Sequence, residues 1–551
     1  MSGMRKRRAE DDEGRNVRRG GASGAAGEAE APELEFEDPF EDEFDSDGDE
    51  DAGAAGASSA GAAAAASSGA AAASAAAGAE ELEALEEESD EDMDESKPTE
   101  VWRGDATALP EGQELTWSAE AYNMLHRFNT PWPCLSFDII PDAMGAGRSR
   151  YPHTAYIVAG ATAPNPRDNK LYVMKLSDMH RTQNDDNDDD PDAVVDDADV
   201  DDDAVLTMQS IPHPGPVNRI SVMPHAPHVV ASWAETGGVH LWDVRHKLAA
   251  LDLSEQSEGA LGKSGAAAVR GGPPPPSGPA YSFMGHASEG FSLAWSGVHA
   301  GRLASGDTSG GLFVWDPLSG AQATSMGGSA GGSGPGVLGA TWRIRPSAYT
   351  GHTGSVEDLQ WSPNESEVLA SCSTDRSVCI WDTREPRRPA MQFKANAAHD
   401  INVISWNRKV PFLVLSGSDD GEICVWDLRE LNKAGGNAEP LARSSWHRKA
   451  ITSIEWSPHD ENCLVACSED DSVSLWDMSL EPETGADAAA AKAAGADDSA
   501  QAGPDIPAQL LFVHQGQSQI KEAHFHEQIP GAVITTSGSG FNVFKPDVKL
   551  A

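Results

Sequence analysis

The chain has 551 residues, with 88 Asp and Glu against 40 Lys and Arg, so its formal net charge is −48 at pH 7. Binding to nucleic acid or to an anionic membrane needs clustered cations, so this balance argues against both and favours basic proteins as partners. No apolar run reaches the length of a membrane span, and the N-terminus lacks the apolar core of a secretory signal.

Residues 1–98 form a low-complexity segment, which we predict to be a disordered tail. It contains two acidic runs, at 33–51 and 80–95, and a third run lies further along the chain at 185–203. Together the three runs hold 35 acidic residues and no Lys or Arg. Runs of like charge repel themselves and commonly act as interaction tails, so the negative charge is concentrated in segments suited to bind a basic partner.

The tail carries two further signals. Basic clusters at 6–8 and 18–19 suit a bipartite nuclear import signal, which would make an import receptor a partner. Within the first acidic run, three phenylalanines recur every four residues: Phe36, Phe40 and Phe44. They are interpreted either as part of a solvated tail or as an aromatic anchor that clamps a basic partner.

Residues 99–130 are predicted to be an N-terminal segment with one short helix over Ser118–Phe128. Ser118 is a suitable N-cap, and apolar residues at helical spacing, among them Leu125 and Phe128, share one side. We expect this helix to pack on the side of the domain that follows it.

Residues 131–546 are organised around a repeated unit, which is clearest at 351–382. The unit opens with Gly-His, closes with Trp-Asp, and contains three short segments of alternating apolar and polar residues separated by turns. Alternation of period two indicates strands, and the Gly-His to Trp-Asp bracket is the signature of one propeller blade. Five such units occur, with 29, 29, 29, 27 and 29 residues from His to Trp. Constant spacing within units that are joined by variable loops predicts a WD-repeat propeller.

Two degenerate blades without Trp-Asp, one at each end, bring the predicted number to seven. The first contains an acidic loop at 184–204, which includes Asp188, Asp189 and Asp190. The last ends near Lys545, too close to the C-terminus for another strand, so its outer strand is expected from 99–117. The predicted fold class is therefore all-β: a seven-bladed β-propeller with no open edge. Flexible insertions are predicted at 255–280, 320–340 and 481–505.

A buried polar relay explains the residue types of the repeat. A His before the blade, a Ser or Thr on the second strand and a Trp on the third can hydrogen-bond in sequence, while an Asp in the tight turn holds the His. We expect the full relay in three blades and a weaker one in the two before them, where Thr236 and Ser309 replace the Asp. The three sets are His352, Asp375, Trp381; His399, Asp420, Trp426; and His447, Asp470, Trp476.

The sequence contains no nucleophile elbow, phosphate loop, zinc pattern or kinase motif. His524 and His526 share one face of a predicted strand, and with no third ligand nearby they are interpreted as structural. We therefore expect a monomeric binding platform rather than an enzyme, with no catalytic residue, cofactor or metal.

Four stretches extend the similarity beyond the general repeat, and on them the chain resembles the glutamate-rich WD-repeat proteins, which are related to the retinoblastoma-binding and chromatin-assembly WD-repeat histone chaperones. They are AYNMLHRFNTPWPCLSFDII at 121–140, GHTGSVEDLQWSP at 351–363, HDINVISWN at 399–407 and LLFVHQGQSQIKEAHFH at 510–526. The long Gly/Pro- and Ala-rich insertions depart from the family pattern.

The resemblance implies a nuclear or nucleolar chaperone that escorts a basic large-subunit ribosomal protein during ribosome assembly. The alternative that it implies is a histone-binding chromatin or replication factor. In the related branch, histones bind in a groove between the N-terminal helix and the propeller, which carries over to Leu125 and Phe128.

A further alternative of another class is a substrate receptor for a cullin-type ubiquitin ligase. Trp-Asp-x-Arg occurs three times, and two of its arginines, Arg384 and Arg429, are candidates to dock the ligase adaptor. An Arg at this position is also a common residue at the end of a strand.

Overall fold

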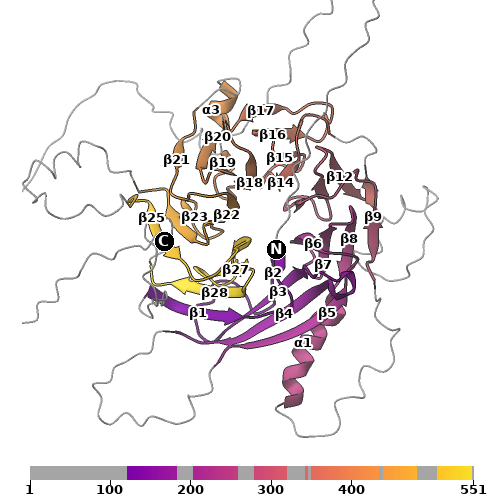
Figure 1. Cartoon of the computed structure of the whole chain (residues 1–551), viewed down its shortest axis with the longest axis vertical. Helices are drawn as coiled ribbons and strands as arrows, with labels where there is room; N and C mark the ends of the chain where they lie inside the picture. Colours follow the sequence, from indigo (N-terminus) through magenta and orange to yellow (C-terminus); the bar gives the residue numbers. More distant parts are fainter. Residues whose placement is uncertain are drawn as a thin grey trace, which may run out of the picture. The chain divides into compact units, whose positions relative to one another are not determined.

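The computed structural model describes residues 121–182, 203–258, 278–318, 342–344, 349–396, 398–433, 439–480 and 506–548. These residues form seven antiparallel sheets of four strands, arranged as the blades of a propeller (Figure 1). The prediction of a seven-bladed, almost all-β propeller is confirmed. Phe36, Phe40, Phe44, Asp188, Asp189 and Asp190 lie outside the described residues.

The blades follow one another along the chain, and each Trp-Asp pair ends the third strand of its sheet. The first three sheets are β2 (Cys134–Ile140), β3 (His153–Ala161), β4 (Lys170–Met179), β5 (Val205–Pro212); β6 (Val217–Val222), β7 (Val229–Ala234), β8 (Val239–Asp243), β9 (Tyr281–Phe283); and β10 (Ser292–Trp295), β11 (Leu303–Gly306), β12 (Leu312–Pro317), β13 (Trp342–Ile344). The next two are β14 (Val356–Trp361), β15 (Val368–Ser373), β16 (Ser377–Asp382), β17 (Met391–Lys394); and β18 (Ile401–Trp406), β19 (Leu413–Ser418), β20 (Ile423–Asp427), β21 (Ala442–Ser444).

The sixth sheet is β22 (Ile451–Trp456), β23 (Cys463–Ser468), β24 (Val473–Asp477) and β25 (Leu510–His514). The seventh joins the two ends of the described chain, because β26 (Glu522–Phe525), β27 (Val533–Ser537) and β28 (Gly540–Pro546) pair with β1 (Tyr122–Phe128). Two α-helices occur among the described residues, α1 (Arg245–Glu258) and α3 (Leu428–Lys433), with a short 3-10 helix, η3 (Pro166–Asp168).

The helix that we predicted over Ser118–Phe128 is wrong, because residues 122–128 form the closing strand β1. Both faces of β1 are buried: Tyr122 and Leu125 pack towards the sixth blade, and Met124 and Phe128 pack towards the first. A register shift between Tyr122 and Met124 produces an apolar spacing that mimics a helical stripe. The prediction of an N-terminal closing strand is right in kind but wrong in position, since we expected it at 99–117.

Side chains of the inner strands join neighbouring blades at the centre of the ring. The inner strand of a blade leaves backbone N–H groups unpaired on its open edge, and a Ser or acidic side chain of the preceding blade accepts from them. These bonds run from Val222 N to Asp138 Oδ2 (2.7 Å), Ile404 N to Asp358 Oδ2 (3.2 Å), Trp456 N to Ser405 Oγ (3.1 Å), Phe525 N to Glu455 Oε2 (3.2 Å) and Phe137 N to Glu522 Oε2 (2.9 Å). The last of them connects the seventh blade to the first and so helps to close the ring.

Candidate functional site

The relay appears in full in the blade that carries His352. The His352 ring donates from Nδ1 to Asp375 Oδ2 (3.0 Å), and its Nε2 lies 2.7 Å from Ser371 Oγ. The Trp381 indole donates to the same hydroxyl over 2.7 Å. Every member is buried or nearly so, hence the relay fixes the turn between blades to the third strand through paired polar groups.

The blade that carries His447 uses the same logic with a different hydroxyl. His447 contacts Asp470 (2.9 Å) and Ser474 (2.7 Å), and Trp476 donates to Ser474 over 2.7 Å. Ser474 lies on the same strand as the Trp, whereas its partner on the second strand, Ala466, has no hydroxyl to offer. The hydroxyl therefore comes from the third strand, and the relay keeps its geometry.

The expectation for His399 is wrong. Its side chain is 50% exposed and its Nε2 lies 3.9 Å from Asp420 Oδ2, too far for a hydrogen bond. Asn396 donates to Asp420 instead (3.2 Å), while Trp426 still donates to Ser416 Oγ (2.8 Å). The His-to-Trp separation of 27 residues already indicated the cause, because His399 lies two residues too close to its Trp to reach the relay position.

The blade that carries His286 also differs from expectation, because its relay is complete. His286 contacts Asp307 Oδ2 (2.9 Å) and Ser305 Oγ (2.8 Å), and Trp315 donates to Ser305 over 2.9 Å. The aspartate comes two residues before Ser309, the position at which we looked for it. In the blade before, His213 donates to the Gly215 carbonyl (2.8 Å), so a backbone oxygen takes the place of the acid.

Acid should weaken the relay at Asp470. Burial alone would raise the pKa of Asp470, but hydrogen bonds from His447 and Ser472 lower it to about 2. A lowered carboxyl pKa contributes stability above the unfolded value near 4, and this contribution, about 2 kcal/mol, is lost as the pH falls from about 4 to 2. Asp470→Asn should therefore unfold more easily than wild type at pH 7 in chemical denaturation, with the difference shrinking towards pH 2.

A suitable control for that experiment is Asp471→Asn. Asp471 lies in the same turn and accepts a hydrogen bond from the backbone N–H of Gln519 (2.6 Å), which an Asn oxygen also accepts. Equal pH curves for the two variants would contradict the assignment of the acid sensitivity to the relay.

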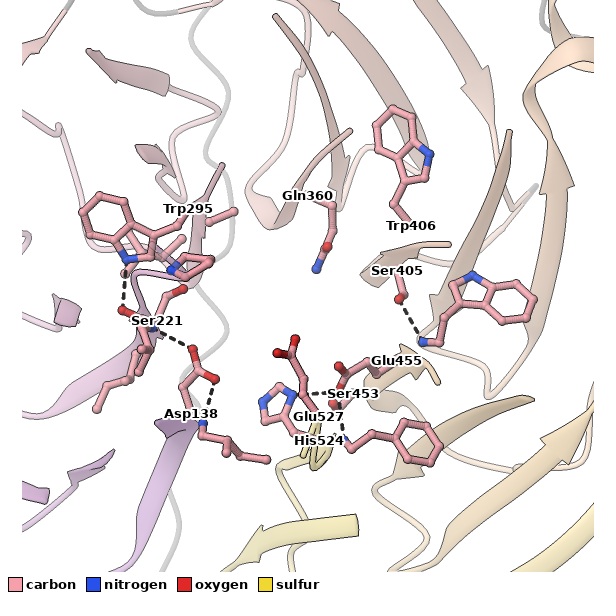
Figure 2. A pocket seen from close by; sticks show the side chains of 18 of the residues that line it. Asp138, Ser221, Trp295, Gln360, Ser405, Trp406, Ser453, Glu455, His524 and Glu527 are labelled. Carbon is pink, nitrogen blue, oxygen red and sulfur yellow. Dashed lines mark hydrogen bonds and ion pairs between the residues drawn. The ribbon is translucent and has the colours of Figure 1, made fainter. Parts of the chain in front are cut away.

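A cavity of about 230 Å³ occupies the centre of the ring. Side chains from the inner strands line it, and Asp138, Gln360, Glu455 and His524 point towards it in the close-up (Figure 2). Four of the seven inner strands contribute a carboxylate near the axis, namely Asp138, Asp358, Glu455 and Glu522. We refer to this space as the central channel.

A charged network fixes these carboxylates. The Arg219 guanidinium donates to Glu522 (2.8 Å) and to Asp358 (3.3 Å), both of which are buried. His524 donates to Glu455 (2.9 Å) and lies 3.7 Å from Glu522. Burial would lower the pKa of His524, but these two carboxylates raise it to about 10, so the ring is cationic at neutral pH. Burial raises the pKa of Asp138 to about 6, partly offset by His524.

Sequence reasoning missed this network because its members lie on strands far apart along the chain. The signal present in the sequence was a carboxylate within otherwise apolar inner strands, as in VEDLQW at 356–361 and ITSIEW at 451–456. His524 and His526 do share a strand end, and among the described residues no group of three or more His, Cys, Asp or Glu is placed to hold a metal ion.

The remaining candidate residues are dispersed. Leu125 and Phe128 are buried in the core of the closing strand, which corrects the expectation that they line a groove beside a helix. Arg384 and Arg429 each pair with the Asp of their own Trp-Asp, at 2.6 and 2.9 Å, and Arg429 also stacks on Phe412. Docking of a ligase adaptor on these arginines stays a prediction. None of the described helices is long and apolar enough to cross a membrane.

Two family models match the chain. Residues 112–180 match the model of the histone-binding protein RBBP4, which also describes a component of the CAF1 complex, and residues 345–382, 388–427 and 438–477 match the WD domain, G-beta repeat. The first match covers β1 to β4, and the second covers three consecutive blades.

Three relatives are similar over most of their length. "Protein HEAT STRESS TOLERANT DWD 1" of Arabidopsis thaliana is 40% identical over 466 residues, which cover 82% of this chain and 92% of the relative. "Ribosome assembly protein rrb1" of Schizosaccharomyces pombe is 36% identical, with 83% and 88% covered. "Glutamate-rich WD repeat-containing protein 1" of Dictyostelium discoideum is 40% identical, with 82% and 86% covered.

Proposed function

Because the chain belongs to the family of glutamate-rich WD-repeat proteins, we propose that it is a non-enzymatic scaffold in ribosome assembly, where it escorts a basic large-subunit ribosomal protein. The propeller supplies a rigid frame, and the acidic runs shield the positive charge of the client from RNA. We place this activity in the nucleus and nucleolus, which the basic clusters at 6–8 and 18–19 would serve through an import receptor.

The single observation that carries the proposal is the segmental distribution of charge. The three acidic runs account for 35 of the 48 excess negative charges in little space, so the rest of the chain has a net charge of only −13. Ribosomal proteins need their cationic surfaces neutralised before they reach RNA, and a dense anionic segment provides this at low sequence specificity. The name of the Schizosaccharomyces pombe relative supports the assignment to ribosome assembly.

Affinity purification tests which client the chain carries. The tagged full-length chain, expressed at its natural level, is purified from nuclear extract and the bound proteins are quantified by mass spectrometry. We expect one large-subunit ribosomal protein to be enriched in near-stoichiometric amount, in material that has not yet entered ribosomal particles. Equal, low recovery of many basic proteins would contradict a dedicated escort.

Histone binding is the second candidate, and one observation favours it. The match of residues 112–180 to the histone-binding family model covers the closing strand and most of the first blade. In the same purification, recovery of histones in excess of any ribosomal protein would select this function instead. Both candidates rely on the same chemistry, an acidic protein that binds a cationic one.

A further inference from the structure

One mouth of the central channel holds a cationic side chain of the chain itself. Arg408 lies in the turn after β18, and its guanidinium pairs with Glu527 in the turn after β26. These turns belong to the fifth and seventh blades, so the pair reaches past the sixth blade that lies between them. We call this region, formed by Asp138, Arg408, Glu455 and Glu527, the exit mouth.

The exit mouth keeps an excess of negative charge even with Arg408 in place. Around the channel, the described residues provide five carboxylates, from Asp138, Asp358, Glu455, Glu522 and Glu527, against three cationic groups, from Arg219, Arg408 and His524. Burial would lower the pKa of Arg408, but Glu527, Glu455 and Asp138 together raise it. A guanidinium is thus the group for which these carboxylates are arranged.

Arg408 is nevertheless weakly held. Its side chain is 60% exposed and that of Glu527 is 48% exposed, so their ion pair is screened by water and exchanges readily. The turn beneath it is fixed, because the Asn407 side chain accepts from the backbone N–H groups of Lys409 and Val410, each over 2.9 Å. The guanidinium can therefore leave the exit mouth by rotation of its side chain alone, without movement of the backbone.

The same cavity has buried donors that lack an acceptor within the described part of the chain. Tryptophans end four inner strands, and two of them donate to the neighbouring blade: Trp295 to the Ser221 carbonyl (3.1 Å) and Trp361 to the Ala294 carbonyl (3.0 Å). Trp456, which is 4% exposed and lines the cavity, finds no partner among the described residues for its indole N–H. The same holds there for Nε2 of His526, 2% exposed and also in the wall, whose Nδ1 accepts from Gln528 N (3.1 Å).

Since His526 Nδ1 is an acceptor, the proton of this neutral ring lies on Nε2, which makes both of these atoms donors. Buried donors of this kind are satisfied by carbonyl oxygens. Of the groups that enter such a cavity, a peptide segment offers a cation for the carboxylates together with carbonyls for the two N–H groups.

We infer that the exit mouth is a binding site for an arginine side chain and its adjoining backbone from a basic protein client, and that Arg408 occupies it while no client is bound. The inference rests on the proposed function and names the place where the propeller itself recognises the client. The acidic runs would attract the client over a distance, and the exit mouth would bind one arginine by exchange with Arg408.

Isothermal titration with the full-length chain tests the site. The probe is an acetylated, amidated hexapeptide of alternating Arg and Gly, compared with the same peptide carrying neutral citrulline. Arg408→Ala removes the competitor and should tighten binding of the Arg peptide about fivefold, the effect of roughly 1 kcal/mol. Adding Asp138→Asn or Glu527→Gln to Arg408→Ala should reverse that gain, and the citrulline peptide should bind none of the variants more tightly than wild type.

The control is Arg443→Ala. Arg443 is 51% exposed and pairs with Glu422 (3.1 Å), so it matches Arg408 in charge and exposure but lies on the outer strand β21. Equal affinity of wild type, Arg408→Ala and Arg443→Ala would overturn the inference, as would a gain that survives both added substitutions. Loss of the ribosomal client with the peptide shifts intact would reject the proposed function and leave the exit mouth standing as a site.

Discussion

Arg219→Leu is expected to lower the free energy of unfolding by about 3–5 kcal/mol, because it leaves two buried carboxylates facing each other without their counter-ion. Glu522 and Asp358 are 6% and 4% exposed, and both receive hydrogen bonds from the Arg219 guanidinium across the channel. Burial would raise the pKa of Glu522, and Arg219 together with His524 lowers it in the native protein. Without Arg219 the two carboxylates repel, so the defect should be larger at pH 8 than at pH 5, measured by denaturant unfolding.

Two further variants separate this effect from a general loss of packing. Arg245→Leu removes an arginine that is 48% exposed and pairs with Asp243, and it should change stability by no more than about 1 kcal/mol. Glu522→Gln added to Arg219→Leu removes one of the stranded charges while keeping an oxygen to accept from Phe137 N, and should restore part of the loss. If Arg219→Leu proved no worse than Arg245→Leu, the channel network would have no role in stability.

Neutralising the acidic runs at 33–51 and 185–203, with Asn for Asp and Gln for Glu, is expected to weaken binding of a basic ribosomal protein on the order of 100-fold at low salt. The two runs hold 24 carboxylates and no Lys or Arg. Salt screens such long-range attraction, with a Debye length of about 8 Å at physiological ionic strength. The wild-type affinity should therefore fall steeply between low and high salt, and that of the neutralised chain should change little.

Exchange of every Asp for Glu and every Glu for Asp in the same runs is the matched control, since it keeps the charge and changes the sequence. This variant should bind as wild type. A third variant, with Phe36, Phe40 and Phe44 replaced by Ser at unchanged charge, reports whether the phenylalanines act as an anchor. Equal affinity of the wild-type and neutralised chains would exclude the electrostatic mechanism.

The architecture was predictable because each blade repeats a local pattern. Gly351 to Asp382 contains the turn, the strands and the Trp-Asp end of one unit, and constant spacing reproduced it along the chain. The exceptions were positional. His399 lies two residues from the place that the relay requires, and Asp307 performs the role that we looked for at Ser309. A spacing rule identifies the unit, but a shift of two residues in a turn changes which side chain reaches the ring.

The closing strand and the channel were not predictable from local patterns. Tyr122–Phe128 has apolar residues on both faces because it lies between two blades, and this buried edge resembles a helical stripe when no partner strand is known. Glu522 accepts hydrogen bonds from Arg219 and from the backbone of Phe137, which come together only when the ring closes. Contacts of this kind depend on the global topology.

The most direct test of the escort function is whether the chain keeps its client soluble in the presence of RNA. A purified large-subunit ribosomal protein is mixed with non-cognate RNA at physiological salt, and light scattering is followed as the full-length chain is added. Suppression of aggregation at a one-to-one ratio with the client, lost when the runs at 33–51 and 185–203 are neutralised, is the predicted result. Scattering that rises equally with and without the chain would contradict it.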